Sequence, residues 1–399
     1  MKKVFLFNIS AMIVLHIIIP IILYGVFGFK YEYASVDIKY VYLSSVLLTS
    51  VLLFVAFYIG IFRRNDTEIE LEDLYESSYL QGKATEYLFV IALVINLSNV
   101  IKTGSFESLL GGSSNGTVIA YLQLFLDIRV LYFCVLLKAY RKKSVRRVLL
   151  WSFLYVMMTL MYFSRSGILW MILFNFWIIY GIDIPQNIKK RVLLIICCAV
   201  IIAPILFMYA TNSRSNQKFS TDYIVQKIVA RISFDEIAGI EMEQYLEGSY
   251  DKELFDRKYG VLNQAEQIVN AVVPGDIFEN DIQPNQYWRA IFSTWSESTC
   301  KLYYMSMPSI LPLYLIIKYG FALGIFLTIT ILIGIYSLIR KMRDPMVCIF
   351  LTGIVFYTVF QFFDWVYHFQ DLFSFFLTFL MIKLMSRFTS RVRIGKYKL

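Results

Sequence analysis

The arginines best suited to chemistry in this sequence lie beside or beyond long apolar segments. Arg165 interrupts the apolar stretch "LYVMMTLMYFSRSGILWMILFNFWIIYGI", and Arg214 follows another apolar segment in "TNSRSNQKF". Arg231 in "VARISFDEIAG" and Arg289 in "NQYWRAIF" lie further along the chain. A guanidinium group is planar and binds a phosphate through two parallel hydrogen bonds. Together, these arginines would be able to hold a diphosphate at the edge of an apolar layer.

Each arginine also has a purely structural interpretation. Arg165 could extend toward lipid headgroups without binding any substrate. Arg231 and Asp235 are four residues apart, so they could form an exposed pair on one helix face, worth only a few tenths of a kcal/mol. Convergence of the four arginines is therefore a hypothesis that the sequence raises and does not itself test.

Acid–base candidates lie near the same positions. Asp235 and Glu236 follow Arg231 closely, and His368 lies in "QFFDWVYHFQD", which we expect to be a loop. Removing a proton from a hydroxyl group as it attacks requires a carboxylate or an imidazole within hydrogen-bond reach. Asp235 is the first candidate for this general base and His368 is the second. The alternative for each is a solvated side chain or a local helix cap.

Two further charges fall inside an apolar segment. In "YLQLFLDIRVLYF", Asp127 and Arg129 are expected near the centre of a membrane-spanning helix, where charged residues are functional candidates by default. Residues two apart on a helix do not face each other. We therefore expect each to have a partner elsewhere or to face a wet cavity.

The composition determines which elements must position these residues. The 399-residue chain is 58% hydrophobic, with a mean hydropathy of +0.61, which predicts an all-α polytopic integral membrane protein. Apolar windows predict ten transmembrane helices, near residues 4–28, 40–62, 86–101, 118–137, 148–163, 167–184, 192–210, 319–339, 346–363 and 372–388.

The apolar run around Arg165 is too long for a single membrane crossing. Two helices joined by a turn at Gly167 would instead cross twice and bring Arg165 to the far surface. Leaving the arginine at the bilayer centre would cost about 2.5–3.5 kcal/mol. We therefore expect a helical hairpin with Arg165 at its tip.

The positions of the basic residues predict the orientation in the membrane. With a cytoplasmic N-terminus, the cytoplasmic connections and the C-terminal tail hold about 22 of the 38 Lys and Arg residues, and the opposite short loops hold about four. This asymmetry predicts that both termini are cytoplasmic. It also explains the net charge of +9 without a nucleic-acid partner.

Three regions follow from this topology. Residues 1–210 would form transmembrane helices 1–7. Residues 211–318 would form one large extracytoplasmic segment, folded as a helical cap. Residues 319–399 would form transmembrane helices 8–10 and a basic cytoplasmic tail.

Several classes of protein chemistry are disfavoured. The sequence has no GxxxxGK[ST], no GxGxxG opening a βαβ unit and no HExxH, which argues against ATP-driven transport and zinc hydrolysis. The chain has two histidines, and its five cysteines form no CxxC pair. We therefore expect no metal site and no cofactor.

Across its whole length the chain resembles the bacterial O-antigen and capsular polysaccharide repeat-unit polymerases of the Wzy type. The resemblance rests on the many predicted spans, the tight "FSRSG" hairpin after a basic connection, and one large late loop. That loop opens with "NSRSN", contains "ARISFDE" and runs into "PSILPLYLIIKYGFALGIF".

The resemblance implies a GT-C-like, metal-independent membrane glycosyltransferase at the periplasmic face of the bacterial inner membrane. It would transfer a growing glycan from undecaprenyl diphosphate to the non-reducing-end hydroxyl of a new lipid-linked repeat unit. Arg165, Arg214 and Arg231 match the family's periplasmic arginines, and Arg289 has a generic likeness. Asp235 or His368 would be the base. A chain-length regulator and a flippase are the implied protein partners.

The same resemblance argues against a ligase, because ligases of this superfamily rely on a histidine in the large loop and this loop has none. The competing interpretation is a flippase for lipid-linked oligosaccharides or another secondary transporter. Asp127 and Arg129 favour the transporter, because transporters bind their substrates near the middle of the membrane. The absence of an internal repeat and the large outer segment favour the enzyme.

Overall fold

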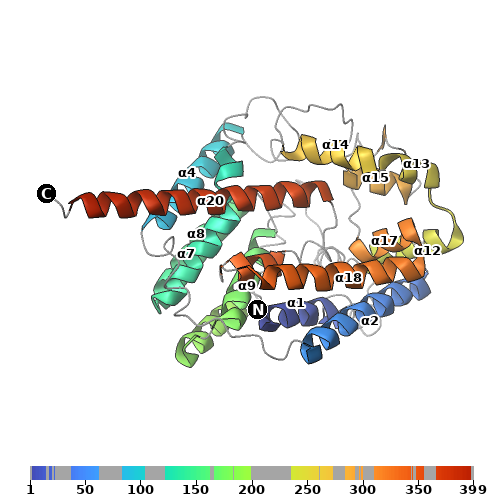
Figure 1. The fold of residues 1–399 in the computed structure, drawn as a ribbon, viewed down its shortest axis with the longest axis horizontal. Helices are drawn as coiled ribbons and strands as arrows, with labels where there is room; N and C mark the ends of the chain where they lie inside the picture. Colours follow the sequence, from blue (N-terminus) through green and yellow to red (C-terminus); the bar gives the residue numbers. More distant parts are fainter. Residues whose placement is uncertain are drawn as a thin grey trace, which may run out of the picture. The chain divides into compact units, whose positions relative to one another are not determined.

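The structure is a computed structural model that describes most of the predicted helices. The described residues are 2–14, 18–19, 22, 37–62, 83–103, 122–161, 166–182, 184–198, 235–259, 261–272, 284–292, 296, 298–299, 310–342, 344, 347–354 and 365–396. These residues are helical almost throughout and contain no β-strand (Figure 1). The all-α prediction is confirmed for this part of the chain.

The chain divides into two compact units, each built from segments distant in sequence. Unit 1 comprises Met1–Asp66, Thr221–Met342 and Leu351–Gln370. Unit 2 comprises Thr67–Ser220, Arg343–Phe350 and Asp371–Leu399.

Unit 1 contains two helices long and apolar enough to cross a membrane. Within α2 (Ile38–Phe62) this stretch is Ile38–Gly60, and it covers the whole of α18 (Phe321–Arg340). Both helices expose large apolar side chains. Those on α2 include Val46, Leu53, Phe54 and Phe57, and those on α18 include Leu323, Phe326 and Leu338. Exposed apolar faces of this kind contact lipid or another protein surface.

The start of the N-terminal helix lies near the carboxyl ends of these two helices. In α1 (Lys2–Ile13), Lys2 Nζ donates to the carbonyl of Gly60, 3.1 Å away, near the end of α2. The ring of Phe5 packs edge-on against Tyr336 in the last turns of α18, with 4.9 Å between ring centroids. Basic residues at the start of α1 and at the end of α18 therefore lie near the carboxyl end of α2: Lys2 and Lys3 on α1, and Arg340 with the C-cap residue Lys341 on α18.

Five further described helices of unit 1 are referred to together as the cap. They are α12 (Asp235–Glu247), α13 (Lys252–Lys258), α14 (Val261–Val272), α15 (Pro284–Ile291) and α17 (Leu311–Tyr319). Leu254, Phe255, Trp288, Phe292 and Tyr314 are among the buried residues of its aromatic core.

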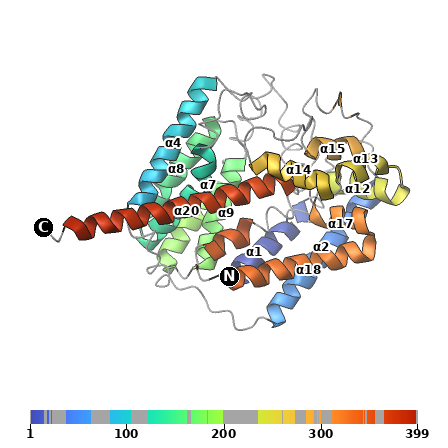
Figure 2. The ribbon, with the colours of Figure 1, turned by 45° about the horizontal axis from the view of Figure 1, so that its top comes forward.

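The cap lies at the amino ends of α2 and α18. The Tyr40 hydroxyl, in the first turn of α2, donates to Glu247 Oε1 at 3.1 Å, and α12 packs along α2. Figures 1 and 2 both show α12, α13 and α17 at these ends. The cap and the basic residues Lys2, Arg340 and Lys341 therefore lie at opposite ends of α2 and α18.

A sharp turn joins the cap to α18. Gly320 has φ = 85°, a conformation that glycine adopts without strain, and α17 folds back along α18. Their backbones come so close that a Cβ atom at Gly324 would lie 2.5 Å from the nitrogen of Ile316. Only glycine fits at this contact.

We expect Gly324→Ala to separate α17 from α18. The destabilisation should be about 1–3 kcal/mol, the usual cost of overpacking, because the colliding atoms belong to the backbone. Gly334→Ala on the same helix is the control, since a Cβ there would meet nothing within 4 Å. Thermal unfolding of both variants in detergent measures the effect, and equal midpoints would contradict the close contact.

Unit 2 is a helical bundle around α7 (Ile128–Arg141). Its other described elements include α4 (Ala84–Thr103), α8 (Val145–Met161), α9 (Ser166–Gly181) and the part of α20 (Trp365–Lys396) from Asp371 onward. Every residue of α7 from Val130 to Tyr140 is buried.

Polar groups pair inside this bundle, while apolar groups cover parts of its outside. The Tyr132 and Ser152 hydroxyls lie 2.8 Å apart, and the Tyr140 hydroxyl donates to Asn175 Oδ1 at 2.7 Å. Phe153 on α8 is in contrast 61% exposed. This pattern reverses that of a soluble helical bundle, whose outer face is polar.

Two expectations about the helices are wrong. The predicted span 118–137 is interrupted, because the helix at residues 122–125 ends and α7 begins only at Ile128. The predicted loop around His368 is helical, because α20 already begins at Trp365. No glycine or proline lies between residues 364 and 371, so the polar residues there do not end a helix.

Candidate functional site

A charged cluster occupies the helix break in unit 2. Asp127 is the N-cap of α7, with an extended backbone at φ = −61° and ψ = 116°. Its Oδ1 accepts from the backbone N–H groups of Arg129, at 2.8 Å, and Val130, at 3.4 Å. An aspartate cap satisfies N–H groups that a helix start leaves without an intrahelical partner.

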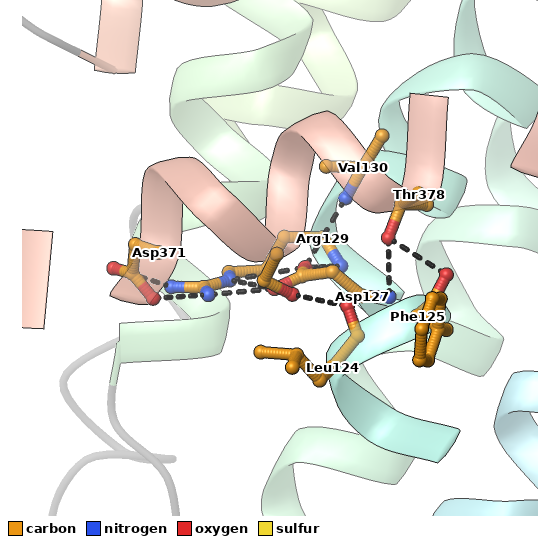
Figure 3. A network of polar contacts seen from close by, with 8 residues as sticks. Leu124, Phe125, Asp127, Arg129, Val130, Asp371 and Thr378 are labelled. Carbon is orange, nitrogen blue, oxygen red and sulfur yellow. Dashed lines mark hydrogen bonds and ion pairs between the residues drawn. The ribbon is translucent and has the colours of Figure 1, made fainter. Parts of the chain in front are cut away.

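Arg129 forms ion pairs with two carboxylates (Figure 3). Its Nη2 donates to Asp127 Oδ2 at 2.7 Å and to Asp371 Oδ1 at 2.5 Å. Nε reaches Asp127 Oδ1 at 3.2 Å, and Nη1 reaches Asp371 Oδ2 at 3.1 Å. The guanidinium also lies over the ring of Phe375, 4.8 Å from its centroid. Both carboxylates are thus held by the planar fork of one arginine.

Two hydroxyl groups of α20 form hydrogen bonds with backbone groups at the helix break. The Thr378 hydroxyl accepts from the Asp127 N–H at 2.9 Å and donates to the carbonyl of Phe125 at 3.1 Å. The Ser374 hydroxyl donates to the carbonyl of Leu124 at 2.9 Å. A broken helix frees backbone groups, and in a membrane these groups must find protein partners. Side chains of α20 provide them here.

The expectation that Asp127 and Arg129 do not face each other is wrong. The rule of spacing applies within a helix, whereas Asp127 precedes α7 and turns its carboxylate back over the first turn. The other expectation, a partner elsewhere, is confirmed for Arg129 by Asp371.

Sequence analysis missed Asp371, although a signal was present. Asp371, Ser374 and Thr378 recur at helical spacing in the mostly apolar "FQDLFSFFLTF". A polar stripe of this kind on an apolar helix marks the face that packs against protein. The stripe is divided between the predicted loop, which ends at Asp371, and the predicted span, which begins at residue 372.

The cluster is arranged for anchoring. The Arg129 side chain is 23% exposed, and those of Asp127 and Asp371 are 8% and 31% exposed. Because the N–H groups of Arg129 already donate to two carboxylates, this guanidinium is not available to bind a phosphate. The described residues include no group of three or more His, Cys, Asp or Glu side chains that could hold a metal ion.

Most of the sequence-predicted site residues cannot be followed in the structure. Arg165, Arg214 and Arg231 lie outside the described residues. Asp235 is the first residue of α12 and His368 lies in the first turns of α20, but their side chains are outside the described part. Their roles therefore stay predictions.

Arg289 is the one predicted site residue whose side chain is described. It lies on α15 and is buried within the cap. Its neighbour Trp288 belongs to the aromatic core and donates its indole N–H to Glu241 Oε1 at 2.7 Å. Arg289 thus belongs to a packed part of the cap.

Charges also gather where the cap meets α2. The pKa of Glu243 is raised, first because burial disfavours its charged form and then because Glu247 repels it from four residues away. The pKa of Asp37 is lowered, mainly because its carboxylate accepts a hydrogen bond from the side chain of Lys39.

We expect Glu243→Gln to raise the thermal midpoint at pH 7. A raised carboxyl pKa in the folded state means that ionisation destabilises the fold, and glutamine removes this charge. The difference from wild type should shrink as the pH falls through about 4.3, the ordinary pKa of glutamate, and disappear near about pH 3, where Glu243 is protonated in both the folded and the unfolded state. Unfolding curves over this pH range measure it. A difference that persists in acid would rule out the electrostatic cause.

Comparison of the chain with protein-family models gives no match. Comparison with curated proteins and with solved structures gives no match either.

Proposed function

We propose that this chain is a polytopic membrane glycosyltransferase that polymerises undecaprenyl-diphosphate-linked oligosaccharide repeat units. It would cross the bacterial inner membrane about ten times, with both termini in the cytoplasm and the cap in the periplasm. The product would be an O-antigen or a capsular polysaccharide. The sequence resemblance is the starting point, and features of both units support it.

The membrane location is supported by the exposed apolar faces. Helices α2, α8 and α18 expose large apolar side chains, whereas hydroxyl and amide groups pair inside the bundle of unit 2. In water such faces would be unfavourable, and in lipid they are required.

The observation that carries the proposal is that the cap and the basic residues of unit 1 lie at opposite ends of α2 and α18. Lys2 and Arg340 lie at one end of α2 and α18, and the packed cap lies at the other. Basic residues stay on the cytoplasmic side. This arrangement favours a cytoplasmic N-terminus and a folded cap outside, where lipid-linked units would be polymerised.

In the proposed reaction, a sugar hydroxyl of the acceptor unit attacks the anomeric carbon of the donor glycan. The new carbon–oxygen bond forms as the bond to undecaprenyl diphosphate breaks, and that electron pair leaves with the diphosphate. The hydroxyl proton passes to Asp235 or, as second choice, His368. Arg165, Arg214, Arg231 and Arg289 would stabilise the negative charge that builds on the leaving group.

One observation favours the transporter alternative. A helix broken at a charged residue, as at Asp127, is typical of transporter binding sites. In this chain, however, the broken helix is already closed by Arg129, Ser374 and Thr378. A cluster with these internal partners serves as an anchor without a transported ligand.

Deleting the gene in cells that make the lipid-linked repeat unit separates the two functions. Loss of a polymerase stops chain growth but not export, so single repeat units should still reach the cell surface. Loss of a flippase traps the units on the cytoplasmic side. Gel analysis of surface glycans therefore supports the proposal if one-unit glycans replace the ladder, and contradicts it if no glycan reaches the surface.

A further inference from the structure

Lys318 lies at the turn between the cap and α18. It is the penultimate residue of α17, and α18 begins three residues later, after Gly320. Helix α18 has 20 residues, a length of about 30 Å, which matches the hydrocarbon thickness of a bilayer. With Arg340 at the cytoplasmic surface, Lys318 would therefore lie at the outer surface.

The ammonium group of Lys318 is held in place by neutral groups. Its Nζ donates to the backbone carbonyl of Tyr259, at 2.7 Å, and to the Tyr314 hydroxyl, at 3.0 Å. The same nitrogen lies 5.4 Å from the centroid of the Tyr314 ring and 5.9 Å from that of Tyr319. Within the described part of the chain, Lys318 forms no salt bridge with a carboxylate.

These contacts leave one of the three N–H groups of the ammonium for another acceptor. A partly buried positive charge whose partners are neutral favours a negatively charged ligand, because hydrogen bonds to neutral groups offset only part of its desolvation. The amino end of α18 adds to this preference, since its cap residue Gly320 supplies no side-chain hydrogen bond. The exposed ring of Tyr319 suits the membrane interface.

We propose that Lys318 binds a lipid-borne phosphate at the outer membrane surface, and that the diphosphate of the polyprenyl donor is its ligand. The inference rests on the proposed function for the direction in which α18 crosses the membrane. It adds to the predicted arginines a cation whose side-chain position is known. The turn at Gly320 and the cap together orient this cation.

A different result is expected if Lys318 has only a structural role. Tyr259 is the C-cap residue of α13, so Lys318 also supplies a donor to the end of that helix. Glutamine at position 318 would keep a hydrogen-bond donor and remove the charge. Lys318→Gln should therefore behave like wild type if capping is the whole role of the residue, and should lose lipid binding if the charge holds a phosphate.

The experiment titrates the full-length protein in detergent with undecaprenyl diphosphate and, separately, with phosphatidylglycerol, and counts bound lipids by native mass spectrometry. Lys318→Gln should bind undecaprenyl diphosphate about tenfold more weakly, the loss expected for one charge-assisted hydrogen bond. Lys318→Arg, which keeps the charge, should retain most of the affinity. Lys252→Gln, at an exposed lysine of the cap, should change nothing.

If Lys318→Gln weakened the binding of phosphatidylglycerol alone, Lys318 would still be a phosphate site. Its ligand would then be an ordinary lipid headgroup and not the diphosphate of the polyprenyl donor. Unchanged affinity of Lys318→Gln for both lipids would overturn the proposal. In case the variants do not fold, acylation of wild-type Lys318 by an N-hydroxysuccinimide ester gives a second readout: bound undecaprenyl diphosphate should protect Lys318 and leave Lys252 reactive. Absence of protection would also overturn it.

The site and the proposed function can fail separately. A protein that binds undecaprenyl diphosphate through Lys318 but extends no glycan would contradict the polymerase and leave this site intact. A protein that polymerises normally as Lys318→Gln and binds both lipids unchanged would contradict the site alone.

Discussion

Replacing Arg129 with methionine should destabilise the protein by about 2–3 kcal/mol, less than the loss of one partner from a fully buried ion pair, because the Arg129 and Asp371 side chains are 23% and 31% exposed. The substitution would leave the Asp127 and Asp371 carboxylates facing each other without their shared cation. It should also loosen the start of α20, because Asp371 would no longer be tied to α7. The yield of folded protein and its thermal midpoint in detergent measure the effect.

The matched control is Lys142→Met at the exposed end of the same helix, which should be nearly neutral. Asp371→Asn should cost less than Arg129→Met, because Asp127 would still pair with Arg129. In the double variant Arg129→Met/Asp371→Asn, the two losses of stability should not add, because both substitutions remove the same ion pair. If Arg129→Met and Lys142→Met were equally stable, the cluster would not be an anchor.

Replacing Arg165 with lysine should reduce polymerisation about 100-fold or more, as expected when one donor to a developing negative charge is lost. Lysine keeps the charge but lacks the planar fork that binds two phosphate oxygens. Protein abundance in the membrane should not change. Glycan chain length and amount, normalised to the protein, measure the result.

Arg146→Lys provides the control, because Arg146 lies in the predicted cytoplasmic connection, in the first turn of α8, and is exposed. It should support a normal ladder. A normal ladder from Arg165→Lys and also from Arg165→Ala would show that Arg165 is a membrane anchor without a role in the reaction.

Helices were predictable wherever apolar runs were long and uninterrupted. The windows 40–62, 86–101 and 319–339 correspond to α2, α4 and α18, whose ends differ from the predicted ones by a few residues. Hydropathy defines such segments well, because every residue of a lipid-exposed helix contributes to the average.

The break at Asp127 was not predictable from hydropathy, because a window average does not register one residue that leaves the helix. The capping role of Asp127 depends on backbone angles, and its closure depends on Ser374 and Thr378, which lie about 250 residues away. Local sequence rules do not connect residues so far apart.

The cap was predictable in its helical character and unpredictable in its packing. Within residues 211–318, which were expected to be helical as a whole, Pro284–Ile291 form α15. The hydrogen bond between Trp288 and Glu241 joins residues 47 apart in the sequence. The hydrogen bond between Lys318 and Tyr259 joins residues 59 apart. These pairings follow from tertiary packing, so Lys318 gave no signal as a candidate in the sequence.

Reconstitution distinguishes a polymerase from a transporter. The purified chain in detergent micelles, where no second compartment exists, receives undecaprenyl-diphosphate-linked repeat unit without nucleotide. A polymerase should yield a ladder of products spaced by one repeat unit, with undecaprenyl diphosphate released at each step. Unchanged substrate in micelles, together with movement of the same lipid across vesicles that contain the protein, would contradict the polymerase and support a transporter.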